Sequence, residues 1–192
     1  MMHAENIADG VSDAPVYCTF ATTCRDGSPI YVRPLRAEDR ELERKFIASL
    51  SETTRFFRML APLRHLPPDL LDRFMDLDGN RRMALVATTR KNGKARFIGV
   101  ARYGATDREG EAEVGVTVTD EWQRQGVAML LMETLIRCAA ERGFQRLVGW
   151  VLPENFRMLA LARRLGFHIR FEPGEKLFRI EKTLASAGAD AS

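Results

Sequence analysis

The hydrophobic period of the chain changes from helical to strand-like near Arg82, and this change constrains the fold more than any other feature. After it, two segments rich in strand formers, 83–89 and 95–103, flank the turn sequence Lys91-Asn-Gly-Lys. A third segment with alternating apolar residues follows at 111–119. Together the three segments predict an antiparallel meander.

Helices and strands alternate in the remainder of the chain. The predicted elements are helices at 127–141 and 153–165 and strands at 147–152, 167–171 and 176–183. A glycine that can end the helix follows each helical segment. The predicted fold class is therefore α/β (α+β), with a mixed, mostly antiparallel sheet flanked by helices.

The N-terminal half predicts a hairpin and then three short helices. Strand formers at 16–23 and 29–34 flank a turn sequence. Helical spacing follows at 37–50, Ser51 is a preferred residue for the start of a second helix, and a third helix begins at Pro67.

The length and composition favour one domain. The chain has 192 residues, of which 45% are hydrophobic and 29% charged, and these values exclude a disordered, collagen-like or coiled-coil chain. We expect a folded domain at 16–184 between loose tails at 1–15 and 185–192. No apolar run approaches the ~18 residues of a membrane span, so we expect no membrane association.

Charge and cysteine content narrow the class of protein further. The net charge is only +3, and the 29 basic residues are scattered among acids, which argues against a nucleic-acid partner. The three cysteines lack metal-binding spacing, so we expect no metal site and reduced thiols. The first 15 residues do not resemble a signal peptide. The expected location is the cytoplasm.

The segment between the third meander strand and the helix at 127–141 has the features of an anion-binding turn. Its residues are Gln123, Arg124, Gln125, Gly126, Val127 and Ala128. Amide groups at a helix N-terminus and the helix dipole favour phosphate, and glycine allows the backbone to approach a ligand. We predict a pyrophosphate cradle, although an ordinary strand-to-helix turn remains the alternative. The segment is neither a Walker loop nor a GxGxxG motif.

A second segment gives this turn its context. Residues 153–167 read Pro-Glu-Asn-Phe-Arg-Met-Leu-Ala-Leu-Ala-Arg-Arg-Leu-Gly-Phe. The two segments, in this order, resemble the GNAT superfamily of acetyl-CoA-dependent N-acetyltransferases over about residues 30–183. The resemblance implies splayed central strands that hold acyl-CoA, and it implies that Asn155 faces the pantetheine arm. A helix cap is the alternative role for Asn155.

The front of the chain resembles a narrower group. Residues 26–39 and 49–58 are similar to the GNAT domain of bacterial Pat-type protein lysine acetyltransferases, which modify acyl-CoA synthetases and related enzymes. The resemblance implies transfer of acetyl from acetyl-CoA to a lysine ε-amine on a protein acceptor, with an acyl-CoA synthetase as the candidate. The alternatives are acetylation of a small amine and a non-catalytic module that senses acyl-CoA.

Transfer to lysine requires a base, because the ammonium has a pKa of about 10.4 and cannot attack a thioester. By resemblance the base is Glu113, on the strand that leads into the anion-binding turn. Glu111 is the rival, since it has the same parity on the strand, and a plain surface glutamate is the alternative for Glu113.

The resemblance also assigns the remaining groups of the site. A backbone N–H near Val116, Thr117 or Val118 would stabilise the oxyanion. Small-molecule members of the superfamily carry a tyrosine that protonates the departing thiolate, but Ala162 occupies that position here. We therefore expect a thiolate that leaves unaided or through water, or an impaired enzyme.

Overall fold

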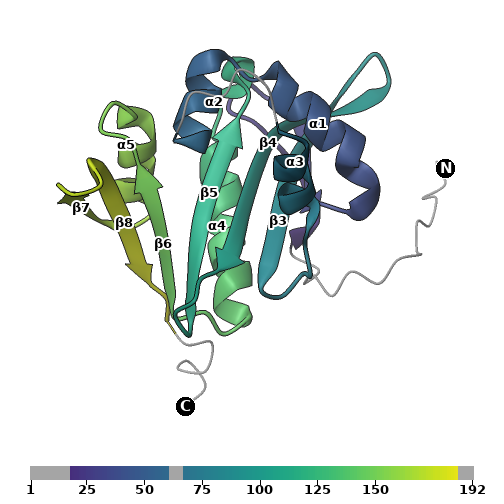
Figure 1. Ribbon diagram of the computed structural model, residues 1–192. Coiled ribbons are helices and arrows are strands. Elements are labelled where there is room, and N and C mark those ends of the chain that lie inside the picture. The colour runs from purple at the N-terminus through teal and green to yellow at the C-terminus, as the bar shows by residue number, and fades with distance from the viewer. Residues whose placement is uncertain (1–17, 61–66, 186–192) are drawn as a thin grey trace.

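An eight-stranded sheet forms the centre of the molecule, with its strands in the order β1-β2-β3-β4-β5-β6-β8-β7 (Figure 1). The structure is a computed structural model and describes residues 18–60 and 67–185. The strands are β1 (Phe20–Thr23), β2 (Pro29–Pro34), β3 (Arg82–Lys91), β4 (Lys94–Ala105), β5 (Glu111–Val118), β6 (Arg146–Val151), β7 (His168–Glu172) and β8 (Leu177–Thr183). Within this sheet β5 and β6 run parallel and all other neighbours run antiparallel. The predicted mixed, mostly antiparallel sheet is confirmed.

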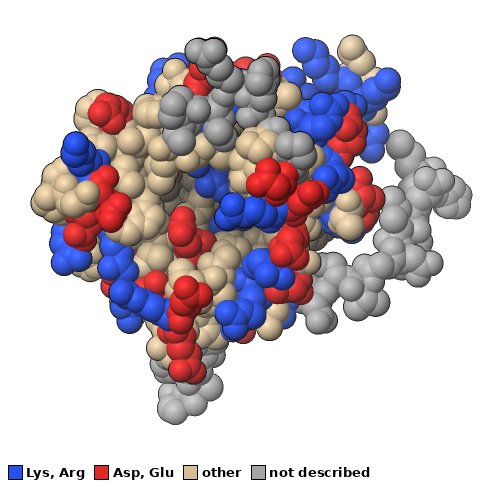
Figure 2. Space-filling view, in the orientation of Figure 1, with Lys and Arg blue, Asp and Glu red and all other residues tan. Residues whose placement is uncertain are grey.

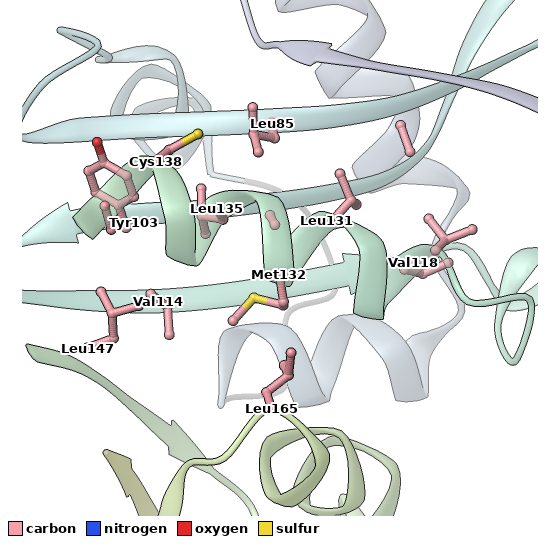
Figure 3. Close-up of a cluster of buried hydrophobic side chains, with 14 of the residues drawn as sticks. Leu85, Tyr103, Val114, Val118, Leu131, Met132, Leu135, Cys138, Leu147 and Leu165 are labelled. Carbon is pink, nitrogen blue, oxygen red and sulfur yellow. The ribbon is translucent and has the colours of Figure 1, made fainter. Parts of the chain in front are cut away.

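Helices cover both faces of the sheet. They are α1 (Arg40–Ser49), α2 (Glu52–Met59), α3 (Pro68–Met75), α4 (Val127–Glu141) and α5 (Phe156–Arg164), with short 3-10 turns η2 (Ala37–Asp39) and η3 (Asp120–Trp122). One apolar core lies where α4 and α5 pack on the sheet, and Figure 3 shows Leu131, Met132 and Leu135 of α4 within it. A second, smaller core lies under α1 and α3 on the opposite face. The sheet therefore separates two cores.

Local sequence signals explain most of these boundaries. The turn between β3 and β4 places Asn92 and Gly93 at positive φ, which is the conformation a two-residue hairpin turn requires. The Oγ of Ser51 accepts a hydrogen bond from the N–H of Thr54 and caps α2. Helix α5 begins at Phe156, later than predicted, because Asn155 is its N-cap.

The two central strands diverge, as the resemblance implied. Strands β5 and β6 pair only along Glu111–Glu113, opposite Arg146–Val148. Beyond Glu113, β5 continues to Val118 with a hydrogen-bonded neighbour on one side alone, which is β4. Figure 1 shows β5 and β6 spreading apart toward the end of the molecule where α4 begins. The split exposes one edge of β5.

The cysteines depart from expectation. Packing of the segment before β1 against α4 brings the fully buried sulfurs of Cys18 and Cys138 together, and the structure joins them as a disulfide. Cys24 is buried and free. The expectation of reduced thiols is therefore wrong for Cys18 and Cys138. The two cysteines are 120 residues apart, and their spacing in the sequence does not predict that they pair.

Some expectations fall outside the described residues. The predicted first strand extended back to Val16, whereas β1 begins at Phe20 and residues 1–17 are not described. The end of the second tail, 186–192, is likewise not described. Within the residues that are described, no helix has the length and apolar character needed to cross a membrane.

Candidate active site

The turn before α4 has an unusual backbone. Arg124 and Gly126 both have positive φ, at 64° and 89°. A Cβ on Gly126 would meet no atom within 4 Å, so the backbone conformation, and not crowding, explains the glycine. No side chain caps the first turn of α4. Its amide groups are therefore available to an anion, and the helix dipole adds positive potential there.

The side chain of Gln123, which is predicted as a phosphate contact, forms hydrogen bonds to three other elements of the protein. Its Nε2 donates to the Val118 carbonyl and to Oγ1 of Thr54, both at 3.2 Å. Its Oε1 accepts from Nη1 of Arg157 at 2.5 Å. The side chain thus joins α2, β5 and α5 around the opening of the split.

A polar cluster fixes α2 against the same turn, and sequence reasoning missed it. Asp120, in η3, accepts hydrogen bonds from the backbone N–H and the Oγ of Ser51 and from Oγ1 of Thr54. Partial burial alone would raise the pKa of Asp120, but the hydrogen bonds from Thr54 and Ser51 outweigh it and leave the pKa lowered. Thr54 and Ser51 lie 66 and 69 residues before Asp120 in the chain, so no local sequence pattern predicts these contacts.

The backbone of β5 presents alternate residues to the split. The N–H of Thr119 donates to the Ile98 carbonyl of β4 at 2.9 Å, so residues of the same parity, including Thr117, also direct their backbone groups to β4. Val116 and Val118 have the opposite parity, and the Val118 carbonyl indeed accepts from Gln123. Among the three predicted oxyanion donors, Val116 and Val118 therefore direct their backbone toward the split, and Thr117 does not.

The two candidate bases lie in different environments. Glu111 is buried, and its carboxylate accepts a hydrogen bond from Oγ1 of Thr106 at 3.1 Å and pairs with Arg179 at 3.5 Å. Glu113 is exposed and has no such partner in the described part of the chain. The geometry favours Glu113 over Glu111 as a group that a substrate can reach.

A charged cluster that was not predicted from the sequence lies beside Glu113, on the face of β5 that α4 does not cover. Its residues, Glu43 of α1, Arg58 of α2, Phe74 of α3 and Arg102 of β4, come from four elements. Arg102 donates to Oε1 of Glu43 at 2.5 Å and to the Phe74 carbonyl at 3.0 Å. The guanidinium of Arg102 lies 4.2 Å from the Phe74 ring centroid, and that of Arg58 lies 5.5 Å from it.

Burial shifts the titration of this cluster. Burial, helped by the neighbouring charge of Arg102, lowers the pKa of Arg58 to about 10. Burial also raises the pKa of Glu43 in spite of its ion pair with Arg102. Oε2 of Glu43 and Oγ1 of Thr117 are buried and have no hydrogen-bond partner among the residues that the structure describes. Figure 2 shows this face of the molecule hollowed over the central strands, with groups of both charges inside the hollow.

The two helix residues singled out from the sequence also have positions in the structure. Oδ1 of Asn155 accepts from the N–H of Met158 at 3.1 Å, so its oxygen caps α5 while its amide nitrogen has no hydrogen bond within the described residues. Ala162 is fully buried in the core beneath α5. No residue in the described part of α5 supplies a phenol in place of the missing tyrosine.

Comparison with known proteins identifies the architecture. The family model for the acetyltransferase (GNAT) domain matches residues 30–168. An acetyltransferase of Pseudomonas aeruginosa is 40% identical over 150 residues, which cover 78% of this chain and 81% of that protein. The acetyltransferase Pat of Mycolicibacterium smegmatis is 32% identical over 150 residues, and the match covers 74% of this chain but only 42% of that longer protein.

Solved structures agree with this assignment. The GNAT domain of Streptomyces lividans Pat superposes with a TM-score of 0.79 at 30% identity, covering 88% of this chain and 99% of that domain. A cAMP-binding acyltransferase from Mycobacterium smegmatis gives a TM-score of 0.60 at 25% identity, covering 88% of this chain and 48% of that one. The divergent β5 and β6, the turn before α4 and these matches lead to one conclusion: the chain is an acetyltransferase and belongs to the GNAT family.

Proposed function

We propose that this acetyltransferase transfers an acetyl group from acetyl-CoA to the ε-amine of a lysine on a protein acceptor. The observation that carries the proposal is the exposed carboxylate of Glu113 at the point where β5 and β6 separate. The relatives named Pat support a protein acceptor, and we take an acyl-CoA synthetase as the first candidate. Because acetyl-CoA is an intracellular metabolite, the proposed location is the cytoplasm.

The site fits acetyl-CoA as a co-substrate. The pyrophosphate would meet the uncapped amides at the start of α4, with the left-handed Gly126 allowing close approach. The pantetheine arm would enter the split and run along the free edge of β5 at Val116 and Val118. The amide nitrogen of Asn155 would face it from the start of α5. Arg124, exposed in the turn, would add positive charge near the phosphates.

The proposed reaction is a direct attack. Glu113 accepts a proton from the lysine ammonium, directly or through a water molecule, and the neutral amine attacks the thioester carbonyl carbon. The N–H of Val116 or Val118 stabilises the oxyanion. The nitrogen of the tetrahedral intermediate loses its excess proton to water, the intermediate collapses, the C–S bond breaks, and CoA leaves as a thiolate. Since a thiol has a pKa of about 8.5, departure without a protein acid is feasible, which accommodates Ala162 in place of a tyrosine.

The test measures release of CoA thiol with a purified acyl-CoA synthetase and, in parallel, with a panel of small amines. We expect thiol release with the synthetase, one acetylated lysine on it by mass spectrometry, and a loss of about 10²–10⁴ in kcat for Glu113→Gln. Acetyl-CoA affinity should be unchanged. Glu109→Gln, an exposed glutamate in the turn before β5, is the matched control and should keep full activity.

Other outcomes would overturn the proposal. Release with a small amine alone would make the chain a small-amine acetyltransferase. Binding of acetyl-CoA without release to either acceptor class would favour a module that senses acyl-CoA. Full activity of Glu113→Gln would remove Glu113 from the mechanism and return attention to Glu111.

A further inference from the structure

The guanidinium of Arg58, on α2, lies over the face of β5 that α4 does not cover. A guanidinium carries five N–H donors, yet that of Arg58 makes no hydrogen bond to any other residue in the described part of the chain. It lies against the Phe74 ring and the backbone of β5: a Cβ built on Gly115 would lie 2.9 Å from Nη1 of Arg58. A partly buried cation without acceptors is suited to an anionic ligand.

The buried charges that face Arg58 do not neutralise it. From α1 it faces Glu43, whose Oε1 already accepts from Arg102 at 2.5 Å. From β4 it faces Arg102, which has the same charge. From β5 it faces Glu113, which is exposed, and from α3 the uncharged Phe74. The two arginines therefore share one buried carboxylate, and only the exposed Glu113 balances the remaining positive charge.

The positions of Glu113 and Arg58 suggest how this positive charge is used. Glu113 and Gly115 lie on the same face of β5, two residues apart, and are thus separated by about 6–7 Å along the strand. If the amine of an acceptor lysine lies at Glu113, the residues next to that lysine are within reach of the Arg58 guanidinium, which lies over Gly115. A guanidinium pairs with a carboxylate through two parallel hydrogen bonds, which gives specificity as well as affinity.

We propose that Arg58 is a specificity-determining residue that binds a carboxylate next to the reactive lysine, so that the preferred acceptor is a lysine flanked by an acidic residue. This inference rests on the proposed function, since it assumes that the amine of a protein lysine enters beside Glu113. The acceptor class is then an acidic lysine-containing segment, not a polyamine, whose added positive charges would meet Arg58 unfavourably.

The test compares two synthetic peptides that differ only in the residues flanking one lysine, which are glutamate in one and glutamine in the other. For the wild-type enzyme we expect kcat/KM to be about tenfold or more higher for the glutamate peptide, as for a charge-assisted hydrogen bond. Arg58→Met should reduce this ratio to about one, and Arg58→Lys should give an intermediate value. Arg73→Met, an exposed arginine on α3, is the control and should keep the wild-type ratio.

The ratio does not depend on the fraction of folded enzyme, so a purely structural role of Arg58 would lower both rates and leave the ratio unchanged. Gly115→Ala gives an independent variant, because its Cβ forces the Arg58 guanidinium to move while the charge remains. It should also lower the ratio. The KM for acetyl-CoA should stay constant for Arg58→Met.

The possible failures are distinguishable. Equal use of the two peptides by the wild-type enzyme, or an unchanged ratio in Arg58→Met, overturns the role of Arg58 and leaves the proposed function standing. Acetylation of neither peptide nor the synthetase, with thiol release to a small amine, overturns the proposed function and the inference with it.

Discussion

The two walls of the site are built in different ways. The turn before α4 uses backbone groups: uncapped amides and two residues at positive φ, Arg124 and Gly126. The other wall uses side-chain charges: Arg58 and Arg102 lie at the Phe74 ring, and Arg102 pairs with Glu43. The turn before α4 is formed by six consecutive residues, 123–128. The charged cluster forms only when α1, α2, α3 and β4 pack together.

The difference has an energetic consequence. A backbone site depends on conformation, so single substitutions act through strain of about 1–2 kcal/mol. In a buried ion pair, the cost of removing both charges from water offsets most of their attraction, so the pair adds little net stability. Removal of one partner nevertheless lowers the free energy of unfolding strongly, because the other charge stays buried without a counter-charge. The charged wall should therefore be the more fragile of the two. Three substitutions test this, from the largest expected effect to the smallest.

Arg102→Met should lower the free energy of unfolding by about 3–5 kcal/mol, because it leaves the Glu43 carboxylate buried without its partner. Urea denaturation measures the change. The double variant Glu43→Gln with Arg102→Met should recover most of the loss. Arg96→Met, which breaks the surface pair with Glu121, should cost less than about 1 kcal/mol. A double variant as unstable as Arg102→Met would refute the explanation by uncompensated charge.

Gly126→Ala should weaken acetyl-CoA binding about tenfold while the fold remains intact. Alanine at a φ of 89° is strained by about 1–2 kcal/mol, and relaxation of the turn would displace the amides of α4. Calorimetric titration with acetyl-CoA measures the affinity. Gly174→Ala, where no positive φ applies and a Cβ meets open space, should bind normally. Unaltered affinity in Gly126→Ala would argue against the turn as the phosphate cradle.

Two substitutions of Asn155 should affect stability and acetyl-CoA binding differently. Asn155→Ala removes the cap on the Met158 N–H and should cost about 1 kcal/mol in thermal unfolding, whereas Asn155→Asp keeps the accepting oxygen and should be nearly neutral. Both lose the amide donor, so both should bind acetyl-CoA about threefold more weakly. Normal binding by Asn155→Asp would leave Asn155 with a capping role alone.

Local patterns predicted much of the fold correctly. The bounds of α4 agree with the helical spacing, and the Asn92-Gly93 turn joins β3 to β4 as expected. The insertion of β8 between β6 and β7 could not be inferred, because the sequence of elements does not specify which edge a hairpin joins.

The candidate site divides in the same way. The turn at 123–128 was predicted from the sequence. The hydrogen bonds of the Gln123 side chain were not, since its partners Thr54 and Arg157 lie 69 and 34 residues away in the chain. The distinction between Glu111 and Glu113 also required the structure: both have the same parity on β5, and the contacts of Glu111 with Thr106 and with Arg179 on β8 show that Glu111 is engaged.

The sequence by itself determined the elements, the mixed sheet, the glycine-containing turn before α4 and the family resemblance, because each depends on residues that are neighbours in the chain. The tertiary structure alone decided that Cys18 meets Cys138, that Glu111 is buried, and that Arg58 lies over Gly115. The physical reason is that cysteine pairing, burial and electrostatic environment depend on contacts between elements that are far apart in the chain, and local hydrophobic periodicity does not predict such contacts.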